Sequence, residues 1–363
     1  MAAELRALGY ARVEIGPSGA GFMTDRAGFE RAGLTLRTAH RLLWVLAEIG
    51  AADADDLYTN LRKSVHWEGL IPPDRTLAVD ASARDNAALR DGRFVALKAK
   101  DAIVDTVRDA RGTRPSVELE APDVLVRVTV RGPRAIVALD GAGKAALHAR
   151  GYRLISGRAP LRETLAAGVL MLAGWTGAEP LVDPLCGSGT LPIEASLLAR
   201  GVAPGTLGRR FGFERWPGHR ADRFAAAISE LRRAARPRAT VSITGSDRVF
   251  DAARDAQANA MRAGVAGDVR FDVADARSWL PPAGPAGLIV ANAPYGERLE
   301  DRAGAHELME ALGRRWREVA RGWRAAVLVG HPDDARALAL DRTEMFALKN
   351  GELDVTLVTG RID

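Results

Sequence analysis

The sequence contains one cysteine, Cys186, only five lysines, and no apolar run of the roughly 20 residues needed to cross a bilayer. A single cysteine excludes a disulfide framework and a multi-thiolate metal site. The six histidines show no metal-ligand spacing, so we expect no metal. The first charges, at Glu4 and Arg6, are not followed by an apolar core of signal-peptide length. These absences indicate a cytoplasmic protein outside the membrane class.

The length of 363 residues is enough for two or three domains, each with its own core. Lysine and arginine (51) outnumber aspartate and glutamate (46), which gives a net charge of +5. This excess suits a polyanionic partner but is modest, so any nucleic-acid surface must come from the arrangement of residues. The oligomeric state stays open.

The first 142 residues alternate short strand and helix patterns, typical of a mixed α+β region. Residues 42–46 are interpreted as a buried strand or a helix end. The other predicted elements are a helix over 2–8 that ends at Gly9, strands at 13–15 and 21–24, helices at 26–39, 53–63 and 93–110, and strands near 77–79, at 124–130 and at 135–139.

From residue 151 the pattern changes to strand, glycine loop and helix in repeated order, which predicts a doubly wound α/β domain. The boundary is expected between 143 and 160. Asn350-Gly351 is a strong hairpin signal and gives the sheet an antiparallel member. The predicted strands are 181–182, 241–244, 269–273, 288–291, 326–329, 346–348 and 355–359.

A glycine-rich loop follows the first of these strands and reads Asp183-Pro184-Leu185-Cys186-Gly187-Ser188-Gly189-Thr190, with a helix predicted over 191–200. Glycines let the backbone approach a ligand, and a helix start offers unpaired N–H groups to a carboxylate or phosphate. Pro192 stands where a dinucleotide fingerprint requires Gly or Ala. The acidic residue before the loop resembles the S-adenosylmethionine loop of class I methyltransferases.

Two later acids follow the next two strands. Asp247 comes after the second strand, where a carboxylate can accept both ribose hydroxyl protons, and Asp275 comes after the third, near an adenine. The alternative is that each caps the helix that follows it.

The segment Asn292-Ala293-Pro294-Tyr295-Gly296 follows the fourth strand. In doubly wound sheets ligands bind at the carboxyl ends of the strands where the strand order reverses, so we expect this segment to lie beside the cofactor. An exocyclic base amine is a poor nucleophile. Acceptors at the Asn292 side-chain oxygen and the Ala293 carbonyl would stabilise its developing positive charge. Tyr295 offers a face on which a base can stack. The alternative is an Asn-Pro turn with a buried tyrosine.

These motifs resemble those of the THUMP-domain guanine-N2 RNA methyltransferases, in particular the bacterial enzymes that modify 23S rRNA. The family's D-P-x-C-G-S-G-T is matched at 183–190 and its N-P-P-Y-G-E-R-L at 292–299 with one departure. Further matches lie at 97–105, 147–153 and 159–167, so the resemblance covers nearly the whole chain.

The resemblance implies a class I Rossmann-like α/β methyltransferase domain, with a mostly parallel seven-stranded sheet and one antiparallel strand, preceded by an α+β THUMP domain that binds RNA. The implied division is a truncated ferredoxin-like part at 1–33, THUMP at 34–142, a linker at 143–159 and the methyltransferase domain at 160–363. The implied S-adenosylmethionine contacts are Asp183, Pro184, Cys186, Gly187, Ser188, Gly189, Thr190, Asp247 and Asp275; the implied catalytic residues are Asn292, Ala293, Pro294 and Tyr295.

Three features depart from the family. Ala293 replaces a proline, although its carbonyl remains, so we expect proline to be tolerated there. The chain ends at Asp363, where some relatives continue into a second methyltransferase domain, so we expect one activity. The opening strand of the first domain is absent, so we expect either that the natural protein begins upstream of Met1 or that this first domain is partly disordered.

Five residues are candidates for contact with RNA. Their alternative interpretations are simple packing over the sheet for those of the long insert, and a solvated helix face for the two lysines. They are Lys98, Lys100, Arg209, Arg210 and Phe211. Cys186 is interpreted as a small apolar filler, because no His or acid is placed to activate it.

We therefore expect S-adenosylmethionine-dependent methylation of guanine N2 in RNA, in 23S rRNA. The alternatives are a tRNA guanine-N2 methyltransferase, an N6-adenine DNA methyltransferase, and an RNA-binding or ribosome-assembly factor with a silent methyltransferase domain. Ala293, which replaces the family's proline, favours only the factor with a silent methyltransferase domain.

Overall fold

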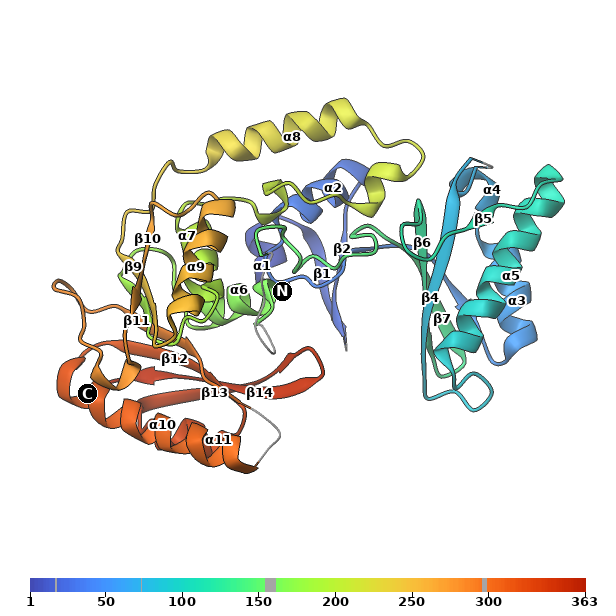
Figure 1. The fold of residues 1–363 in the computed structure, drawn as a ribbon. Helices are drawn as coiled ribbons and strands as arrows, with labels where there is room; N and C mark the ends of the chain where they lie inside the picture. The colour runs from blue at the N-terminus through green and yellow to red at the C-terminus, as the bar shows by residue number, and fades with distance from the viewer. Residues whose placement is uncertain (17, 73, 154–160, 296–298) are drawn as a thin grey trace.

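The computed structural model describes the chain except residues 17, 73, 154–160 and 296–298, and describes 299–302 by backbone alone. Its strands form sheets of two, five and seven strands. The five-stranded and seven-stranded sheets lie at opposite ends of the molecule with the two-stranded sheet between them (Figure 1). Within the described ranges, no helix is long and apolar enough to cross a bilayer.

The two-stranded sheet is an antiparallel hairpin flanked by two helices. The predicted order of elements is confirmed, although the second helix stops at Thr35, since Leu36 is extended. Glu4 is buried and accepts the main-chain N–H groups of Arg37 at 2.6 Å and Thr38 at 3.2 Å, which anchors the first helix. The elements are α1 (Ala2–Ala7), β1 (Ala11–Gly16), β2 (Gly19–Met23) and α2 (Arg26–Thr35).

The five-stranded sheet has the order β3-β7-β6-β4-β5 and carries α3 and α5 along one face (Figure 1). The helix predicted over 93–110 is confirmed as α5. Of the segment 42–46, residues 43–46 belong to a strand, and they are exposed or half-buried instead of buried. Asp53 and Asp91 cap α3 and α5 with their side chains. The elements are β3 (Leu43–Gly50), α3 (Ala54–Ser64), α4 (Trp67–Leu70), β4 (Thr76–Arg84), α5 (Gly92–Arg111), β5 (Ser116–Val117), β6 (Val124–Arg131) and β7 (Arg134–Asp140).

The seven-stranded sheet has the order β10-β9-β8-β11-β12-β14-β13, with β14 antiparallel to both neighbours and the other strands parallel. The predicted fold class is thus confirmed. Its strands are β8 (Leu181–Asp183), β9 (Ile243–Asp247), β10 (Val269–Val273), β11 (Leu288–Asn292), β12 (Arg324–Val329), β13 (Asp341–Asn350) and β14 (Leu353–Arg361). The strand predicted at 241–244 is β9, which begins two residues later and ends three residues later than predicted.

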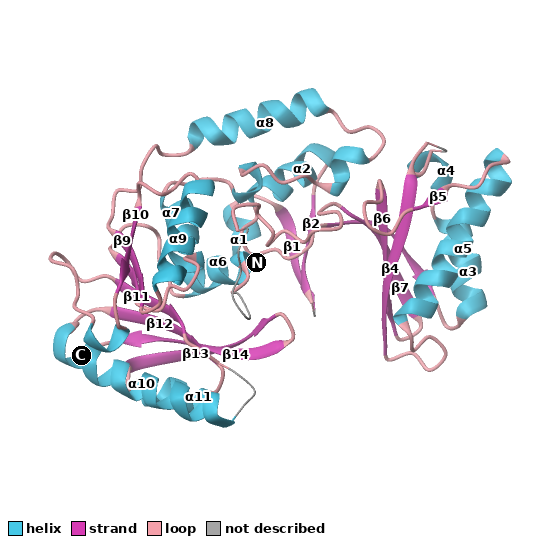
Figure 2. Cartoon of the chain, viewed as in Figure 1, coloured by secondary structure: helices cyan, strands magenta, loops and turns pink. Residues whose placement is uncertain are grey.

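Helices cover both faces of this sheet (Figures 1 and 2). The run of β11 is hydrophobic without interruption because Leu288 and Val290 pack on one helical layer while Ile289 and Ala291 pack on the other. One layer holds α6 (Glu163–Leu172), α7 (Thr190–Ala199) and α9 (Phe250–Arg262), and the other holds α10 (Leu299–Val319) and α11 (Pro332–Ala337). The chain switches direction across the sheet between β8 and β11, which places the ligand crevice at their carboxyl ends.

The insert between α7 and β9 packs onto the N-terminal part. It contains η1 (Pro204–Thr206), η2 (Gly212–Arg215) and α8 (Ala221–Ala234). Phe211, Phe213 and Trp216 are buried in one aromatic cluster with Phe29 of α2 and Phe224 of α8. The insert is therefore a packing element that joins the seven-stranded sheet to the N-terminal layer, which consists of α1, β1, β2 and α2.

A buried ion pair joins three parts of the chain. Arg150 Nε lies 2.7 Å from Glu194 Oε1 on α7, with side chains 2% and 0% exposed. Tyr152 donates its hydroxyl to the same oxygen at 3.1 Å, and Arg150 Nη2 donates to the Arg37 carbonyl at 2.8 Å. The segment after β7 is thereby tied both to α7 beside the seven-stranded sheet and to Arg37, which follows the N-terminal layer. The domain boundaries 33/34, 142/143 and 159/160 stay predictions.

Removing one partner of this pair should destabilise the protein strongly. We expect Arg150→Met to lower the free energy of unfolding by about 3–5 kcal/mol, because the Glu194 carboxylate stays buried without its cation. The matched control Arg31→Met breaks an exposed pair with Glu230 and should cost less than about 1 kcal/mol. Urea unfolding followed by tryptophan fluorescence measures both, and equal losses would contradict the assignment.

Candidate cofactor and active site

Three of the predicted site residues stand at the carboxyl ends of neighbouring parallel strands. Asp183 ends β8, Asp247 ends β9 and Asn292 ends β11. β8 pairs with both of the other strands, so the three side chains lie at one edge of the sheet. The N–H of Ala274, one residue before Asp275, donates to the Asp247 carbonyl at 3.0 Å, which brings the end of β10 to the same edge.

The glycine-rich loop is held against β9 and α9. Gly187 donates its N–H to Asp247 Oδ2 at 3.0 Å, and Asn259 donates to the Ser188 carbonyl at 3.0 Å. Gly189 has φ +82°, and a Cβ there would lie 2.9 Å from the Ala256 Cβ and 3.0 Å from the Phe271 ring. Only glycine fits this turn, which leads directly into α7.

Asp183 is a fully buried carboxyl group without a cation. It is 1% exposed, and its Oδ1 accepts the Leu185 N–H at 3.0 Å. Burial raises the pKa of Asp183 from 3.8 to about 8, and the nearby Asp247 acts in the same direction. Because no described residue places a basic side chain in ion-pair contact with it, the group fits a ligand that brings its own positive charge.

Asp247 and Asp275 differ in what their side chains contact. The Asp247 carboxylate accepts Gly187 N–H on one oxygen and Val249 N–H, at 2.9 Å, on the other, which leaves lone pairs for further donors such as ribose hydroxyls. Asp275 is exposed and caps the 3-10 turn η3 (Ala276–Ser278) through the Arg277 N–H at 2.9 Å. The capping alternative thus describes the contacts of Asp275, and its contact with an adenine stays a prediction.

The remaining loop residues shape the backbone. Pro184 and Cys186 are buried, and burial raises the pKa of the Cys186 thiol well above its usual value, which agrees with a filler. The Thr190 hydroxyl accepts Arg153 Nη2 at 2.7 Å, so the first residue of α7 is tied to the segment that follows the buried ion pair.

Asn292 presents a free acceptor at the end of β11. Its Oδ1 is buried and has no hydrogen-bond partner among the residues that the structure describes. Asn350 at the end of β13 donates to the Tyr295 hydroxyl at 2.9 Å. Burial raises the pKa of Tyr295, and the nearby Asn350 and Asn292 side chains act in the opposite direction. Pro294 is exposed, and the rest of the motif at 296–298 lies outside the described residues.

Ala293 uses the N–H that a proline would lack. The group donates to the Leu328 carbonyl at 2.9 Å and extends the β11–β12 pairing by one residue, with the side chain 2% exposed. Proline would remove this bond and leave a buried carbonyl unpaired, at a typical cost of about 1–3 kcal/mol. The expectation that Ala293→Pro is tolerated considered only the carbonyl and stays a prediction, with the loss of this hydrogen bond as its cost.

The candidate RNA contacts fall into two groups. Phe211 is buried in the aromatic cluster, and Arg209 lies over its ring while donating to the carbonyls of Ala142 and Ala146. Burial lowers the pKa of Arg209 to about 10. The prediction for Phe211 is corrected, because its ring is buried and not available to RNA. Arg209 is partly exposed; its hydrogen bonds favour the packing alternative, and its contact with RNA stays a prediction.

The other three candidates lie on the surface. Arg210 is 93% exposed with a weak pairing to Glu214. Lys98 lies over the Tyr58 ring, and Lys100 pairs with Asp101. Their contact with RNA stays a prediction.

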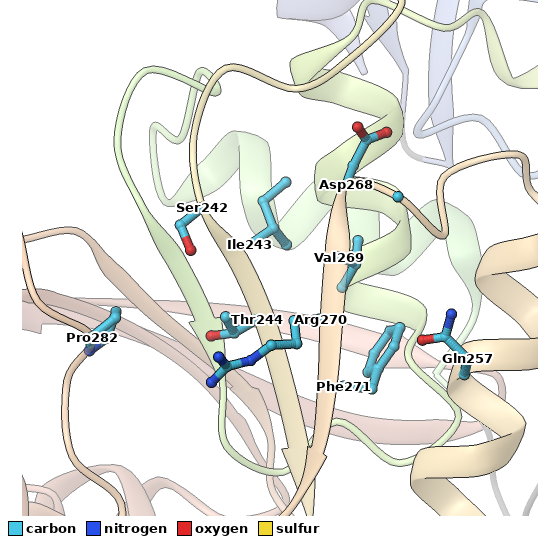
Figure 3. Close-up of a pocket in the computed structure, with 10 residues that line it drawn as sticks. Ser242, Ile243, Thr244, Gln257, Asp268, Val269, Arg270, Phe271 and Pro282 are labelled. Carbon is cyan, nitrogen blue, oxygen red and sulfur yellow. The ribbon is translucent and has the colours of Figure 1, made fainter.

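A pocket of about 370 Å³ lies at the opposite ends of β9 and β10 (Figure 3). Ser242, Ile243, Asp268 and Val269 line it, all at the amino ends of their strands. It is therefore separate from the carboxyl edge that holds Asp183 and Asp247. In the described ranges, no group of three His, Cys, Asp or Glu side chains could hold a metal, and the expected absence of metal stays a prediction.

Residues 150–359 match the model of the RMKL-like methyltransferase domain, and residues 51–140 match the THUMP domain. The chain belongs to the RMKL-like methyltransferase family. The family recognition is thus confirmed, together with a THUMP domain and the fold of S-adenosylmethionine-dependent methyltransferases.

Several proteins are similar to this RMKL-like chain over nearly its whole length. The ribosomal RNA large subunit methyltransferase K/L of Syntrophotalea carbinolica is 39% identical over 99% of the chain and 51% of that protein. A Synechocystis sp. PCC 6803 protein, described as an RNA methyltransferase, is 34% identical over 98% of the chain and 92% of that protein. The crystal structure of SMU.472, described as a methyltransferase and complexed with SAH, matches with TM-score 0.88 and 25% identity, over 99% and 94% of the two chains.

The chain spans about half the length of the K/L relatives that it matches.

The raised pKa of Asp183 predicts how stability changes with pH. A carboxyl group whose pKa is raised in the folded state contributes fully to the free energy of unfolding below its ordinary pKa of 3.8. This contribution is lost progressively as the pH rises to about 8. Asp183→Asn keeps the acceptor for Leu185 and cannot ionise. We expect the variant's unfolding free energy, relative to wild type, to increase by about 1.4 kcal/mol per pH unit between pH 5 and 7 and to level off above pH 8. Urea unfolding of both proteins across this range measures it, and a constant difference would show that Asp183 is ionised throughout.

Proposed function

We propose that the chain transfers a methyl group from S-adenosylmethionine to the exocyclic N2 of a guanine in RNA, with 23S rRNA as its substrate and the cytoplasm as its place of action. The observation that carries the proposal is the buried, unpaired Oδ1 of Asn292 at the carboxyl end of β11. The names of the K/L relatives and the THUMP match support RNA as the substrate.

The cofactor fits the residues at the carboxyl edge. Asp183 is a buried carboxyl group that a cationic ligand would favour in its ionised form, and Asp247 retains lone pairs for ribose hydroxyls. The start of α7 behind Gly187 and Gly189 offers N–H groups to a carboxylate. When bound, S-adenosylmethionine supplies an electrophilic methyl group on a sulfonium centre.

The protein's part is to orient a base amine and to stabilise its developing charge. The Asn292 oxygen and the Ala293 carbonyl accept hydrogen bonds from the amine, which favours a pyramidal nitrogen. A base must leave its stack to reach them, and the Tyr295 ring gives it a face on which to stack, typically worth about 1–3 kcal/mol. The Asn350 hydrogen bond to the Tyr295 hydroxyl holds that ring in place.

Asn292→Ala should abolish methyl transfer while leaving cofactor affinity within about twofold of wild type, because the removed oxygen acts on the base in the transition state. Radiolabelled methyl transfer to unmodified 23S rRNA and calorimetric titration with S-adenosylhomocysteine measure the two effects. Near-normal turnover would make Asn292 a turn former only.

The control for this variant is Asp247→Ala, which should show the reverse pattern. We expect it to weaken cofactor binding by roughly 1.5–3 kcal/mol, the scale of hydrogen bonds to a charged group. Transfer should recover at saturating cofactor, provided that the loop keeps its place without the Gly187 bond.

Nucleoside analysis identifies the product and the substrate. We expect N2-methylguanosine to be lost from the 23S rRNA fraction of a deletion strain and restored by the wild-type gene but not by Asn292→Ala. Loss of the mark from tRNA would indicate the tRNA enzyme, and loss of N6-methyladenosine from DNA would indicate a DNA enzyme. Unchanged nucleosides in all fractions would leave only the silent RNA-binding factor.

A further inference from the structure

Two histidines stack where the THUMP sheet joins the methyltransferase domain. His40 precedes β3 and His148 follows β7, 108 positions later. Their rings are nearly parallel, with centroids 5.1 Å apart and Nδ1 atoms 3.4 Å apart. The main-chain N–H of Leu147 donates to the His40 carbonyl at 2.9 Å and holds the two segments together. Within the described chain no side chain hydrogen-bonds either Nε2 atom. The contact between the two Nδ1 atoms uses the proton of one neutral ring, so the other ring carries its proton on Nε2 and can donate it to a ligand.

The surroundings of the pair are positive. Burial lowers the pKa of both imidazoles, to about 4 for His148, and the guanidinium groups around them act in the same direction. His40 faces Arg162, Arg41 and Arg127, and His148 faces Arg162, Arg153 and Arg41. Asp140, which faces His40, acts in the opposite direction.

Among these four arginines, Arg162 is the one that has no carboxylate partner in the described part of the chain. Arg41 and Arg127 both pair with Asp140, at 3.1 and 2.7 Å, and Arg153 lies 3.5 Å from Glu163. No acidic side chain in the described part of the chain forms an ion pair with Arg162. Its guanidinium is partly exposed at the turn between β13 and β14, where a Cβ on Gly351 would lie 3.3 Å from Nη2.

Arg162 also stands beside the proposed base-binding residues. Its main-chain N–H lies 3.4 Å from Asn350 Oδ1, and the Asn350 side chain donates to the Tyr295 hydroxyl. The histidine pair and Arg162 therefore lie between the THUMP domain and the residue that offers a stacking face to the base.

We infer that His40, His148 and Arg162 bind a backbone phosphate of the RNA strand that carries the target nucleotide. This inference rests on the proposed function in taking RNA as the ligand. A guanidinium offers a fork of N–H donors that matches phosphate oxygens, and an imidazole Nε2–H adds a further donor. One bound phosphate at this place fixes the distance between the RNA held by the THUMP domain and the base at Tyr295.

The first test is RNA binding by the full chain at several salt concentrations, with a short fluorescein-labelled RNA of mixed sequence. Arg162→Gln should weaken binding about tenfold and reduce the slope of log affinity against log salt by about 0.7–0.9, the contribution of one phosphate. Arg162→Lys should keep the slope. The matched control Arg270→Gln removes a charge at the far edge of the seven-stranded sheet and should change affinity less than twofold.

The second test observes the histidines directly. The chain has six, so their labelled ring signals can be resolved by NMR and assigned with His40→Gln and His148→Gln. The RNA should move these two signals at concentrations far below those at which inorganic phosphate does so. Saturation by micromolar phosphate alone would make the ligand a free phosphate compound and overturn the inference.

The outcomes separate this inference from the proposed function. Unchanged affinity and slope in Arg162→Gln would overturn the phosphate site even if the wild-type protein methylates 23S rRNA. Loss of S-adenosylhomocysteine binding in Arg162→Gln with normal RNA binding would assign Arg162 to the cofactor instead. A wild-type protein that binds RNA, loses affinity in Arg162→Gln and transfers no methyl group would confirm the phosphate site and contradict the proposed function.

Discussion

The buried contact between Arg150 and Glu194 is the constraint on which the arrangement of the molecule depends. Glu194 lies on α7, the helix that begins at the glycine loop, so the contact reaches the cofactor crevice from behind. Two charges this deeply buried lose their hydration, and the loss is offset only while both remain paired. The same carboxylate receives the Tyr152 hydroxyl and faces Arg37, whose pKa burial lowers to about 10. Glu194 thus connects three parts of the molecule: the methyltransferase domain through α7, the segment after β7 through Arg150 and Tyr152, and the N-terminal layer through Arg37.

The crevice itself follows from strand order. Because β8 lies between β9 and β11, a loop after β8 must pass the ends of both neighbours. The acids and amide that end these strands therefore meet at the loop although they are far apart in the sequence. The loop is fixed in turn by hydrogen bonds from Gly187 and to Ser188. Its backbone is shaped before a ligand arrives, which lowers the ordering cost of binding.

Local patterns were enough to predict the sheet and the site residues that end its strands. The uninterrupted apolar run of β11, the Asn350-Gly351 turn and the glycine loop each express a backbone requirement within a few residues. Neighbours distant in the chain were not predictable in this way. An aromatic and a basic residue, Phe211 and Arg209, are residue types that often contact RNA. In this structure Phe211 packs on Phe224 of α8, and Arg209 donates to the Ala146 carbonyl in the segment after β7. The bond from Ala293 to Leu328 requires the register of β11 and β12, which the motif alone does not contain.

The binding of a cationic ligand beside Asp183 is coupled to the release of a proton. With a pKa of about 8, the carboxyl group carries a proton at neutral pH in the ligand-free chain. A positively charged ligand that approaches it favours the ionised form, so the proton leaves as the ligand enters and the buried region stays close to neutral in both states. The enthalpy of such an exchange depends on the buffer that receives the proton, and the occupancy of the crevice responds to alkalinity as well as to the concentration of the ligand.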